Sequence, residues 1–292
     1  MIYSKPKQLR DVCHEPTATS TEAAIAPPLL TIREVEASSV VANNRMNRER
    51  MLLGVNSYQN ELGRVGSPGT TDLVGFLTAL ATRLDGIEWI DCCCGEGNAL
   101  IQAGTALVNS PVATSFRFEG IDLVGMFSEV PASIRNQVHL RAGSVSEWTA
   151  VRCYDLITCI HGVHYLGDKL GFIRKAIGCL KPSGRLIMSM DPDNLRDERG
   201  ASLAAWWRAE CRRNGWEYQP RRHLLRVDGF KTWSAAWQFL GSDDQAGPNY
   251  TGQAAVDSYY QIVRDSVMKS NKSCQEDDPW KNPRRQYQNE LS

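Results

Sequence analysis

The sequence predicts an α/β fold in which a mainly parallel sheet is covered by helices on both faces. Short runs of aliphatic and aromatic residues alternate with segments of helical periodicity between residues 86 and 191. The clearest predicted strand, residues 87–91, leads into a glycine turn and then into a predicted helix over residues 99–107. A strand, a glycine turn and a helix in this order open a βαβ unit, which joins parallel strands through a covering helix.

The other predicted elements continue this alternation. Further strands are expected over residues 116–123, 138–141, 154–160, 185–190 and 223–227. Further helices are expected over residues 44–61, 72–84, 169–180, 201–214 and 254–268. The segment Lys181-Pro-Ser-Gly184 breaks the helix that precedes the fifth strand, because proline cannot continue a helical hydrogen-bond pattern.

The alternation divides the chain into four segments. We expect a mostly disordered tail over residues 1–44, in which only residues 32–41 carry enough aliphatic side chains for one short element. A helical cap or lid is expected over residues 45–85. The α/β domain then covers residues 86–268, with a late loop insertion, and a polar C-terminal tail covers residues 269–292.

The composition favours a globular protein without a general affinity for polyanions. The 292 residues are 42% hydrophobic, and 33 lysines and arginines balance 33 aspartates and glutamates. Such a balance gives no general attraction to nucleic acid or to an anionic membrane. The nine cysteines contain no C-x-x-C pair, and neither a signal peptide nor a membrane-spanning run is evident. We therefore expect a cytoplasmic protein with reduced thiols.

The turn Asp91-Cys-Cys-Cys-Gly-Glu-Gly97 has the chemistry of a ligand-binding turn. Gly95 and Gly97 lack Cβ atoms, so backbone N–H groups there can meet a ligand closely. Asp91 can accept hydrogen bonds from a cationic amine, and Asp122, which ends the next strand, can bind two vicinal hydroxyls. The alternatives are a turn that only packs and an aspartate that only caps a helix.

Four segments between residues 86 and 191 resemble the ordered motifs of class I S-adenosylmethionine-dependent methyltransferases: DCCCGEGNAL, FEGIDL, YDLITCIHGVHYL and CLKPSGRLIMSM. The resemblance implies a doubly wound, Rossmann-like sheet of seven strands, six parallel and one antiparallel, with an N-terminal helical lid. It also implies that the cofactor lies across the carboxyl ends of the first strands.

The cofactor-binding residues that the resemblance implies follow the first four strands, with one from the lid. They are Tyr58, Asp91, Cys93, Gly95, Gly97, Asp122, Leu123, Ser144, Val145, Ile160 and His161. The turn holds the methionine part, Asp122 the ribose, and Ser144 and Val145 the adenine. Two positions depart from the family pattern, because Cys93 replaces a usual glycine and Ser144 replaces a usual acid.

The methyl acceptor is expected near His164, Asn249 and Tyr250. His164 follows the fourth strand, and an imidazole there can act as the general base that removes the proton of the acceptor. A structural histidine is the alternative, and methyl transfer can proceed by positioning alone. Asn249 and Tyr250 belong to the loop Gly247-Pro-Asn-Tyr-Thr-Gly252, which is either an acceptor-binding loop or an ordinary surface turn.

Two further patterns are not assigned to a site. The adjacent cysteines 92–94 do not predict a metal centre, because successive side chains of a strand point to opposite faces. Four tryptophans recur at spacings of helix packing, which favours a core over an acceptor pocket: Trp206, Trp207, Trp233 and Trp237.

The sequence thus predicts an enzyme that uses S-adenosyl-L-methionine and releases S-adenosyl-L-homocysteine. The acceptor is expected to be an oxygen, nitrogen or carbon atom of a small-molecule metabolite or natural product, with no nucleic-acid or membrane partner and with a homodimer as the general prior. One alternative is a catalytically inactive binding or assembly subunit. Another is a nicotinamide-dependent oxidoreductase, although the chain lacks the G-x-G-x-x-G pattern of dinucleotide binders.

Overall fold

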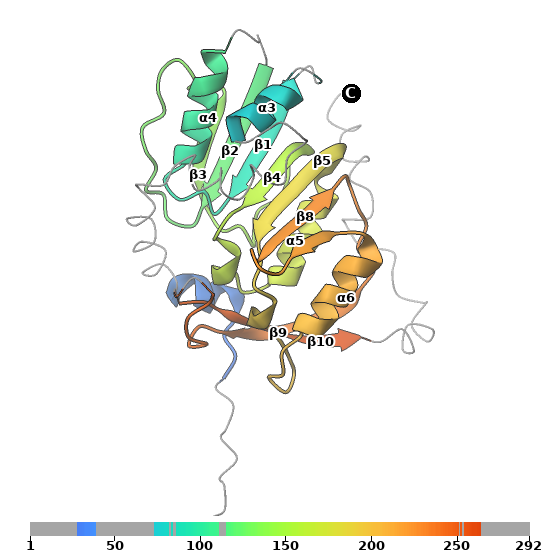
Figure 1. The fold of residues 1–292 in the computed structure, drawn as a ribbon. Helices are drawn as coiled ribbons and strands as arrows, with labels where there is room; N and C mark the ends of the chain where they lie inside the picture. Colours follow the sequence, from blue (N-terminus) through green and yellow to red (C-terminus); the bar gives the residue numbers. More distant parts are fainter. Residues whose placement is uncertain are drawn as a thin grey trace, which may run out of the picture.

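The computed structural model describes residues 28–38, 73–81, 83, 86–110, 115–250, 252 and 254–263, and these residues form two sheets (Figure 1). The larger sheet has seven strands in the order β3-β2-β1-β4-β5-β8-β7. Its strands are β1 (Gly86–Cys92), β2 (Ser115–Asp122), β3 (Val138–Ala142), β4 (Tyr154–Cys159), β5 (Leu180–Ser189), β7 (Glu217–Gln219) and β8 (Leu224–Asp228). The smaller sheet has the order β6-β10-β9, formed by β6 (Leu195–Asp197), β9 (Ala236–Asp243) and β10 (Asp257–Val263).

The strand directions of the larger sheet agree with the predicted fold class. All pairs from β3 through β5 are parallel. Strand β8 is antiparallel to both β5 and β7, so β8 alone runs against the other six strands. The chain moves outward from β1 to β3 on one side and then returns to β4 on the other side. The strand order therefore reverses between β1 and β4, where ligands of open α/β sheets commonly bind.

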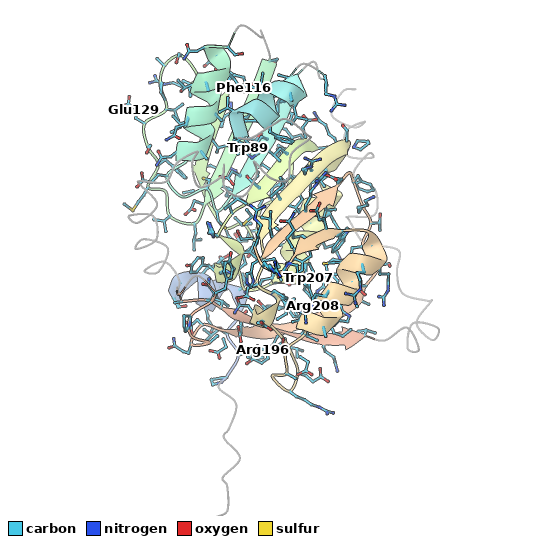
Figure 2. The ribbon with its side chains drawn as sticks, in the orientation of Figure 1. Trp89, Phe116, Glu129, Arg196, Trp207 and Arg208 are labelled. Carbon is cyan, nitrogen blue, oxygen red and sulfur yellow. The ribbon has the colours of Figure 1, made fainter. Side chains whose placement is uncertain are left out.

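Helices cover both faces of this sheet. On one face, α3 (Leu73–Ala81) and α4 (Asn98–Val108) pack over β1 and β2, while α5 (Lys169–Gly178) and α6 (Ala204–Asn214) pack on the other side (Figure 1). Strand β1 supplies both layers by simple alternation: Trp89 packs with α3 and α4, and Ile90 packs with α5. Figure 2 shows Trp89 beside α3 and α4, and Trp207 on α6.

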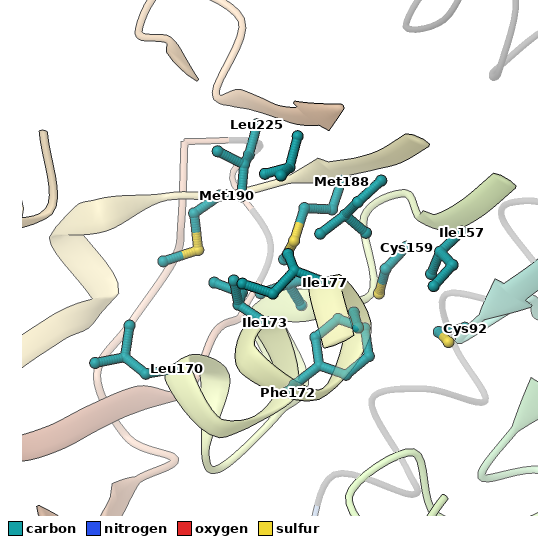
Figure 3. Close-up of a cluster of buried hydrophobic side chains, with 14 of the residues drawn as sticks. Cys92, Ile157, Cys159, Leu170, Phe172, Ile173, Ile177, Met188, Met190 and Leu225 are labelled. Atoms are coloured by element: carbon teal, nitrogen blue, oxygen red, sulfur yellow. The ribbon is translucent and has the colours of Figure 1, made fainter. Parts of the chain in front are cut away.

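The layer on the α5 side contains the larger apolar cluster (Figure 3). Phe172, Ile173 and Ile177 on α5 face Cys159 and Met188 of the sheet, and all five side chains are buried. The segment Lys181-Pro-Ser-Gly184, predicted as a helix breaker, lies within β5, where the pairing with β4 shifts register between Tyr154 and Leu156. The proline and the turn around it are thus accommodated as an irregularity of the strand.

The smaller sheet corrects the prediction for the end of the chain. A helix was expected over residues 254–268, but β10 is a strand that pairs antiparallel with β9 and parallel with β6. The helical prediction is wrong because Val256, Tyr260 and Val263 also recur at helical spacing. Tyr260 is buried against the amino end of α5, where the Leu170 N–H donates to the Tyr260 hydroxyl at 3.1 Å. This packing favours the strand over a helix.

The short element predicted within residues 32–41 is a helix over residues 32–38. A capping box begins it: the Thr31 N–H donates to Glu34 Oε2 at 2.7 Å, and the Glu34 N–H donates to Thr31 Oγ1 at 3.4 Å. Leu30 joins the smaller sheet through a bridge to Ser242, with N···O distances of 2.7 and 2.9 Å, and Val35 is fully buried. We call residues 28–38 the N-terminal strap.

Two predictions lie wholly or mainly outside the described residues, namely the helix over residues 44–61 and the C-terminal tail. Of the helix predicted over residues 72–84, the described part is α3. Among the residues that the structure describes, no helix combines the length and apolar character needed to cross a bilayer.

Candidate functional site

The turn between β1 and α4 bends sharply through three residues in the left-handed region. The φ angles are 58° at Cys93, 59° at Gly95 and 78° at Gly97. The Cys94 N–H donates to the Ile121 carbonyl at 3.1 Å, which ties the turn to the end of β2. The φ of Gly97 favours glycine at the start of α4, and a Cβ there would lie 2.5 Å from Leu140 Cδ1, so the leucine side chain would have to move.

Asp122 connects this turn to two strands. Its buried carboxylate accepts the Gly95 N–H at 2.8 Å through Oδ2 and the Val124 N–H at 3.0 Å through Oδ1. Its carbonyl accepts the Gly143 N–H at 2.8 Å, just beyond β3. The predicted cofactor residues Gly95 and Asp122 are therefore in direct contact, and the carboxylate is held in a fixed orientation at the carboxyl edge of the sheet.

Asp91 places a second buried carboxylate at the same edge. Its Oδ1 accepts the Thr158 hydroxyl at 2.6 Å, across the pairing of β1 with β4. Thr158 in turn accepts the Trp89 indole N–H at 2.9 Å. A charged-group hydrogen bond of this length fixes the Asp91 side chain at the strand end, where it can receive a cationic group.

Cys93 and Gly162 make the closest approach between the turns that follow β1 and β4. Cys93 occupies a left-handed conformation that favours glycine, which explains why glycine is usual at this position in the family that the sequence resembles. A Cβ on Gly162 would lie 2.3 Å from the Cys93 Cβ and 2.9 Å from its Sγ. Because Gly162 has no side chain, there is room for the side chain of Cys93.

Of the cysteines next to Cys93, Cys92 is fully buried and Cys94 is half-buried. Burial raises the pKa of the Cys92 and Cys94 thiols well above their ordinary value, and the nearby charge of Asp91 raises both further. A metal ligand has to be the thiolate, so these protonated thiols are poor ligands. No group of three or more metal-ligating side chains occurs within the described parts of the chain.

Ser144 contacts a residue that the sequence did not indicate. Its hydroxyl donates to Glu36 Oε1 of the N-terminal strap at 2.5 Å and accepts the Ser146 N–H at 3.0 Å. Arg33 of the same strap lies 3.7 Å from Glu147 in an exposed ion pair. The strap therefore brings a carboxylate to the position after β3, where the family usually has an acid and this chain has serine.

The other predicted cofactor residues differ in their surroundings. Val145 and Ile160 are buried in the two apolar layers, 4% and 3% exposed, which is the environment of core residues. Leu123 is half-buried directly after β2. His161 has a φ of 58°, and its N–H donates to Ser189 Oγ at 3.1 Å, which links the ends of β4 and β5. Tyr58 lies outside the described residues.

Two residues predicted on the acceptor side meet in space. His164, in the short helix η1 (Val163–Tyr165), is 1% exposed, and its ring makes an edge contact with the Tyr250 ring at a centroid distance of 5.3 Å. Asn249, the neighbour of Tyr250, is 8% exposed. The loop before β10 is therefore folded back on the turn after β4.

His223 is the residue that the sequence did not single out in this region. Its ring stacks on Tyr250 at a centroid distance of 3.8 Å and an interplanar angle of 3°, and its Nδ1 lies 3.6 Å from Asp191 Oδ1. The Met190 N–H donates to the His223 carbonyl at 2.6 Å, so β5 and β8 hold this histidine at the sheet edge. The sequence around His223 gives no local signal, because its contacts come from segments that are distant in the sequence.

Lys169 joins this side of the site to the smaller sheet. Its fully buried Nζ donates to the Leu166 carbonyl at 2.8 Å, the Val256 carbonyl at 2.6 Å and Ser258 Oγ at 2.9 Å. Burial lowers the pKa of Lys169 to about 7, although nearby carboxylates, chiefly Asp257, oppose the shift. The lysine loses its proton far more easily in the fold than in water.

This pKa predicts a pH dependence of stability. Between the folded value of about 7 and the ordinary value of 10.5, the unfolded chain binds the Lys169 proton and the folded chain does not, so the free energy of unfolding should rise with pH. Lys169→Met should remove this rise in urea unfolding measured over roughly pH 6 to 10. The exposed Lys231→Met is the matched control and should keep the wild-type slope. An unchanged slope in Lys169→Met would contradict the prediction.

The comparison with protein families gives one match. A family model described as "Methyltransferase domain" matches residues 71–233, which is more than half of the 292 residues. This range contains the turn after β1, Asp122, Ser144, His164 and His223. No curated protein matches the chain.

Solved structures give weaker likenesses. A putative S-adenosyl-L-methionine-dependent methyltransferase from Methanococcus maripaludis is 13% identical, with a TM-score of 0.43, over 66% of this chain and 94% of that chain. A methyltransferase from Thiobacillus denitrificans in complex with S-adenosyl-L-homocysteine is 24% identical, with a TM-score of 0.32, over 42% and 48%. YjhP from E. coli is 20% identical, with a TM-score of 0.31, over 48% and 55%. The chain thus spans about half the length of the last two.

Proposed function

This chain belongs to the methyltransferase-domain family, and from that premise we propose that it transfers a methyl group from S-adenosylmethionine to an oxygen, nitrogen or carbon atom of a small organic molecule. The observation that carries the proposal is the pair of buried carboxylates, Asp91 and Asp122, at the ends of neighbouring strands on either side of a left-handed turn. When bound, the cofactor supplies a methyl group on a sulfonium, which is an activated leaving group.

The residues at this edge fit the chemical groups of S-adenosylmethionine. Asp122 has the carboxylate needed for two vicinal ribose hydroxyls, and its anchoring by Gly95 and Val124 keeps it in place without ligand. Asp91 provides a negative charge for the amino group of the methionine part. The turn at Gly95 has no Cβ and so permits a close approach to the backbone.

The acceptor class and the lid complete the proposal. The equal numbers of acidic and basic residues favour a small molecule over nucleic acid as the acceptor. We propose that His164, Asn249 and Tyr250 face this acceptor, because the loop that carries Asn249 and Tyr250 packs on the turn after β4. We also propose that residues 45–85 form a helical lid and that Tyr58 within it contacts the cofactor.

Glu36 should contribute to cofactor affinity. Its carboxylate, held by the Ser144 hydroxyl, stands where a hydrogen-bond acceptor for the adenine amine is expected. Glu36→Gln should weaken S-adenosylmethionine binding by about 10-fold, the effect of one hydrogen bond to a charged group. Titration calorimetry measures it, with Glu34→Gln, an exposed neighbour on the same strap, as the matched control. Equal affinities of Glu36→Gln and Glu34→Gln would remove Glu36 from the cofactor site.

The proposed function is tested by calorimetric titration with S-adenosylmethionine, S-adenosylhomocysteine and NADH. We expect saturable binding of the first two and none of NADH. Binding of NADH alone would favour the oxidoreductase alternative, since strand, glycine turn and acid are shared with dinucleotide binders. Absence of binding by either sulfur compound would overturn the proposal.

A further inference from the structure

We propose that His223, oriented by Asp191, is the general base of the reaction and that the acceptor is an aromatic hydroxyl compound that stacks on Tyr250. The inference rests on the proposed function and names its acceptor class and its base. It differs from the assignment of His164, which the sequence alone suggested. The proposal is based on contacts between three segments that are distant in the sequence. Asp191 follows β5, His223 precedes β8, and Tyr250 lies in the loop before β10.

Asp191 and His223 form a close pair without a hydrogen bond between them, and Asp191 lies on the Nδ1 side of the ring. Asp191 is 6% exposed, and its Oδ1 lies 3.6 Å from His223 Nδ1, within ion-pair distance. A carboxylate on this side favours the tautomer with the proton on Nδ1, which leaves Nε2 as the proton acceptor. The His223 side chain is 25% exposed, so the pair is only partly covered by the protein. Such pairs are often long before the substrate binds.

The position of His223 is maintained at a conformational cost. Its φ of 49° lies in the left-handed region, which is unfavourable for a residue with a Cβ. Two contacts hold it there: the Met190 N–H donates to its carbonyl at 2.6 Å, and Tyr250 stacks flat on its ring at 3.8 Å. Strain of this kind is typical of residues that serve a site.

The contacts of the imidazole with described residues come from three segments. Asp191 faces it from the turn after β5, and Tyr250 covers one face of the ring from the loop before β10. The His164 ring contacts the same Tyr250 ring at a centroid distance of 5.3 Å. Arg222, the preceding residue, directs its guanidinium to Gln219 Oε1 at 3.3 Å. Asp191 is therefore the carboxylate that lies beside the Nδ1 side of the His223 ring.

The two side chains indicate the acceptor class. An imidazole base is most useful for a hydroxyl group, which has to lose its proton as the oxygen attacks, whereas a neutral amine attacks before it loses one. Tyr250 is 39% exposed, with His223 stacked on its ring and the His164 ring in edge contact, and we place the aromatic ring of the acceptor against the exposed part of Tyr250. Both features together favour a phenol.

The proposed reaction transfers the methyl group from the sulfonium to the acceptor oxygen. The acceptor oxygen forms a bond to the methyl carbon, and the bond between that carbon and sulfur breaks. Its electron pair stays on sulfur, which becomes the neutral thioether of S-adenosylhomocysteine. The hydroxyl proton moves to His223 Nε2, and Asp191 stabilises the resulting imidazolium.

The test uses the full chain, radiolabelled S-adenosylmethionine and three probes of graded acidity: 4-methoxyphenol, phenol and 4-nitrophenol. His223→Gln should lower kcat on 4-methoxyphenol and phenol by about 100-fold or more, the usual contribution of a general base. It should affect 4-nitrophenol least, because that probe ionises without help. The acidic limb of the pH profile of kcat/KM should disappear in His223→Gln, while cofactor affinity from calorimetry stays the same. Asp191→Asn, which can still cap the short helix after β5, should reproduce part of the loss.

The matched control is His139→Gln, a histidine on β3 outside this group, which should keep the wild-type pH profile. Equal losses on all three phenols with an unchanged pH profile would assign His223 a structural role and overturn the proposal. Cofactor binding without methylation of any phenol by the wild type would overturn the acceptor class. Absence of cofactor binding would instead remove the proposed function itself, so the two failures are distinguishable.

Discussion

Asp122→Asn is expected to weaken binding of S-adenosylmethionine by about 100-fold, the combined effect of two hydrogen bonds to a charged group. The carboxylate accepts backbone N–H groups at both oxygens, from Gly95 and Val124. An amide can accept at only one of these positions, and its NH₂ group opposes the other donor. The change should therefore loosen the turn after β1 and also remove the charge that we propose to face the ribose. Titration calorimetry on the folded variant measures the affinity.

A matched control separates binding from stability in this experiment. Asp155 is also a buried aspartate of the same sheet, on β4, and its Oδ2 accepts hydrogen bonds from the Glu88 N–H at 2.9 Å and from Lys181 Nζ at 2.6 Å. It lies at the start of β4, the opposite edge of the sheet. Asp155→Asn should lower the free energy of unfolding and leave the affinity near that of the wild type. Similar affinities of Asp122→Asn and the wild type would refute a role of Asp122 in binding the cofactor.

The second large effect is expected from Gly162→Ala, which should lower the free energy of unfolding by about 2 kcal/mol or more through overpacking. Gly162 has a φ of −92° and a ψ of −32°, which alanine adopts readily. The cost comes from the new Cβ, which would lie 2.3 Å from the Cβ of Cys93. Since both atoms are attached to backbone, the turns after β1 and β4 have to separate. Urea unfolding measures the change in stability, and calorimetry measures the accompanying loss of cofactor affinity.

A double variant tests whether the Cys93 side chain is the cause. Cys93→Gly removes the obstructing atoms at a position whose φ of 58° suits glycine, so Cys93→Gly with Gly162→Ala should recover most of the stability. Gly178→Ala is the control, because a Cβ there meets no atom within 4 Å and should be tolerated. Additive losses in the double variant would show that the clash lies elsewhere.

The sequence was sufficient for the regular part of the fold. The strands β1 to β5 and the helices α4 to α6 follow from alternation and periodicity, because each buries one face or both against a neighbour in the chain. The strands β6, β7 and β9 were not predicted. Strand β7 has only three residues, Glu217–Gln219, too few to show a period. The prediction for β10 failed because Tyr259, Tyr260, Ile262 and Val263 also fit a helical period, and the aromatic and β-branched content was the better indication.

The residues of the candidate site also fall into two groups, those marked by a local sequence motif and those brought together by long-range contacts. Asp91, Gly95 and Asp122 were predictable because a motif in one continuous segment, or the residue at the end of a strand, marks them. Glu36 was not, since it meets Ser144 across 108 positions of sequence. His223 was not either, because its contacts with Asp191 and Tyr250 arise only when β5, β8 and the smaller sheet assemble. No local sequence pattern predicts such long-range contacts.

The N-terminal strap and the smaller sheet affect how the protein should be trimmed for study. A fragment cut to the family match, residues 71–233, would lack Glu36, Tyr250 and the strands β9 and β10. Strand β6 would lose its pairing with β10, and the buried Lys169 would lose two of its three acceptors. Such a fragment exposes an unpaired edge and invites aggregation. An inactive or insoluble fragment would therefore say little about the proposed activity, and screens for acceptors should use the full chain.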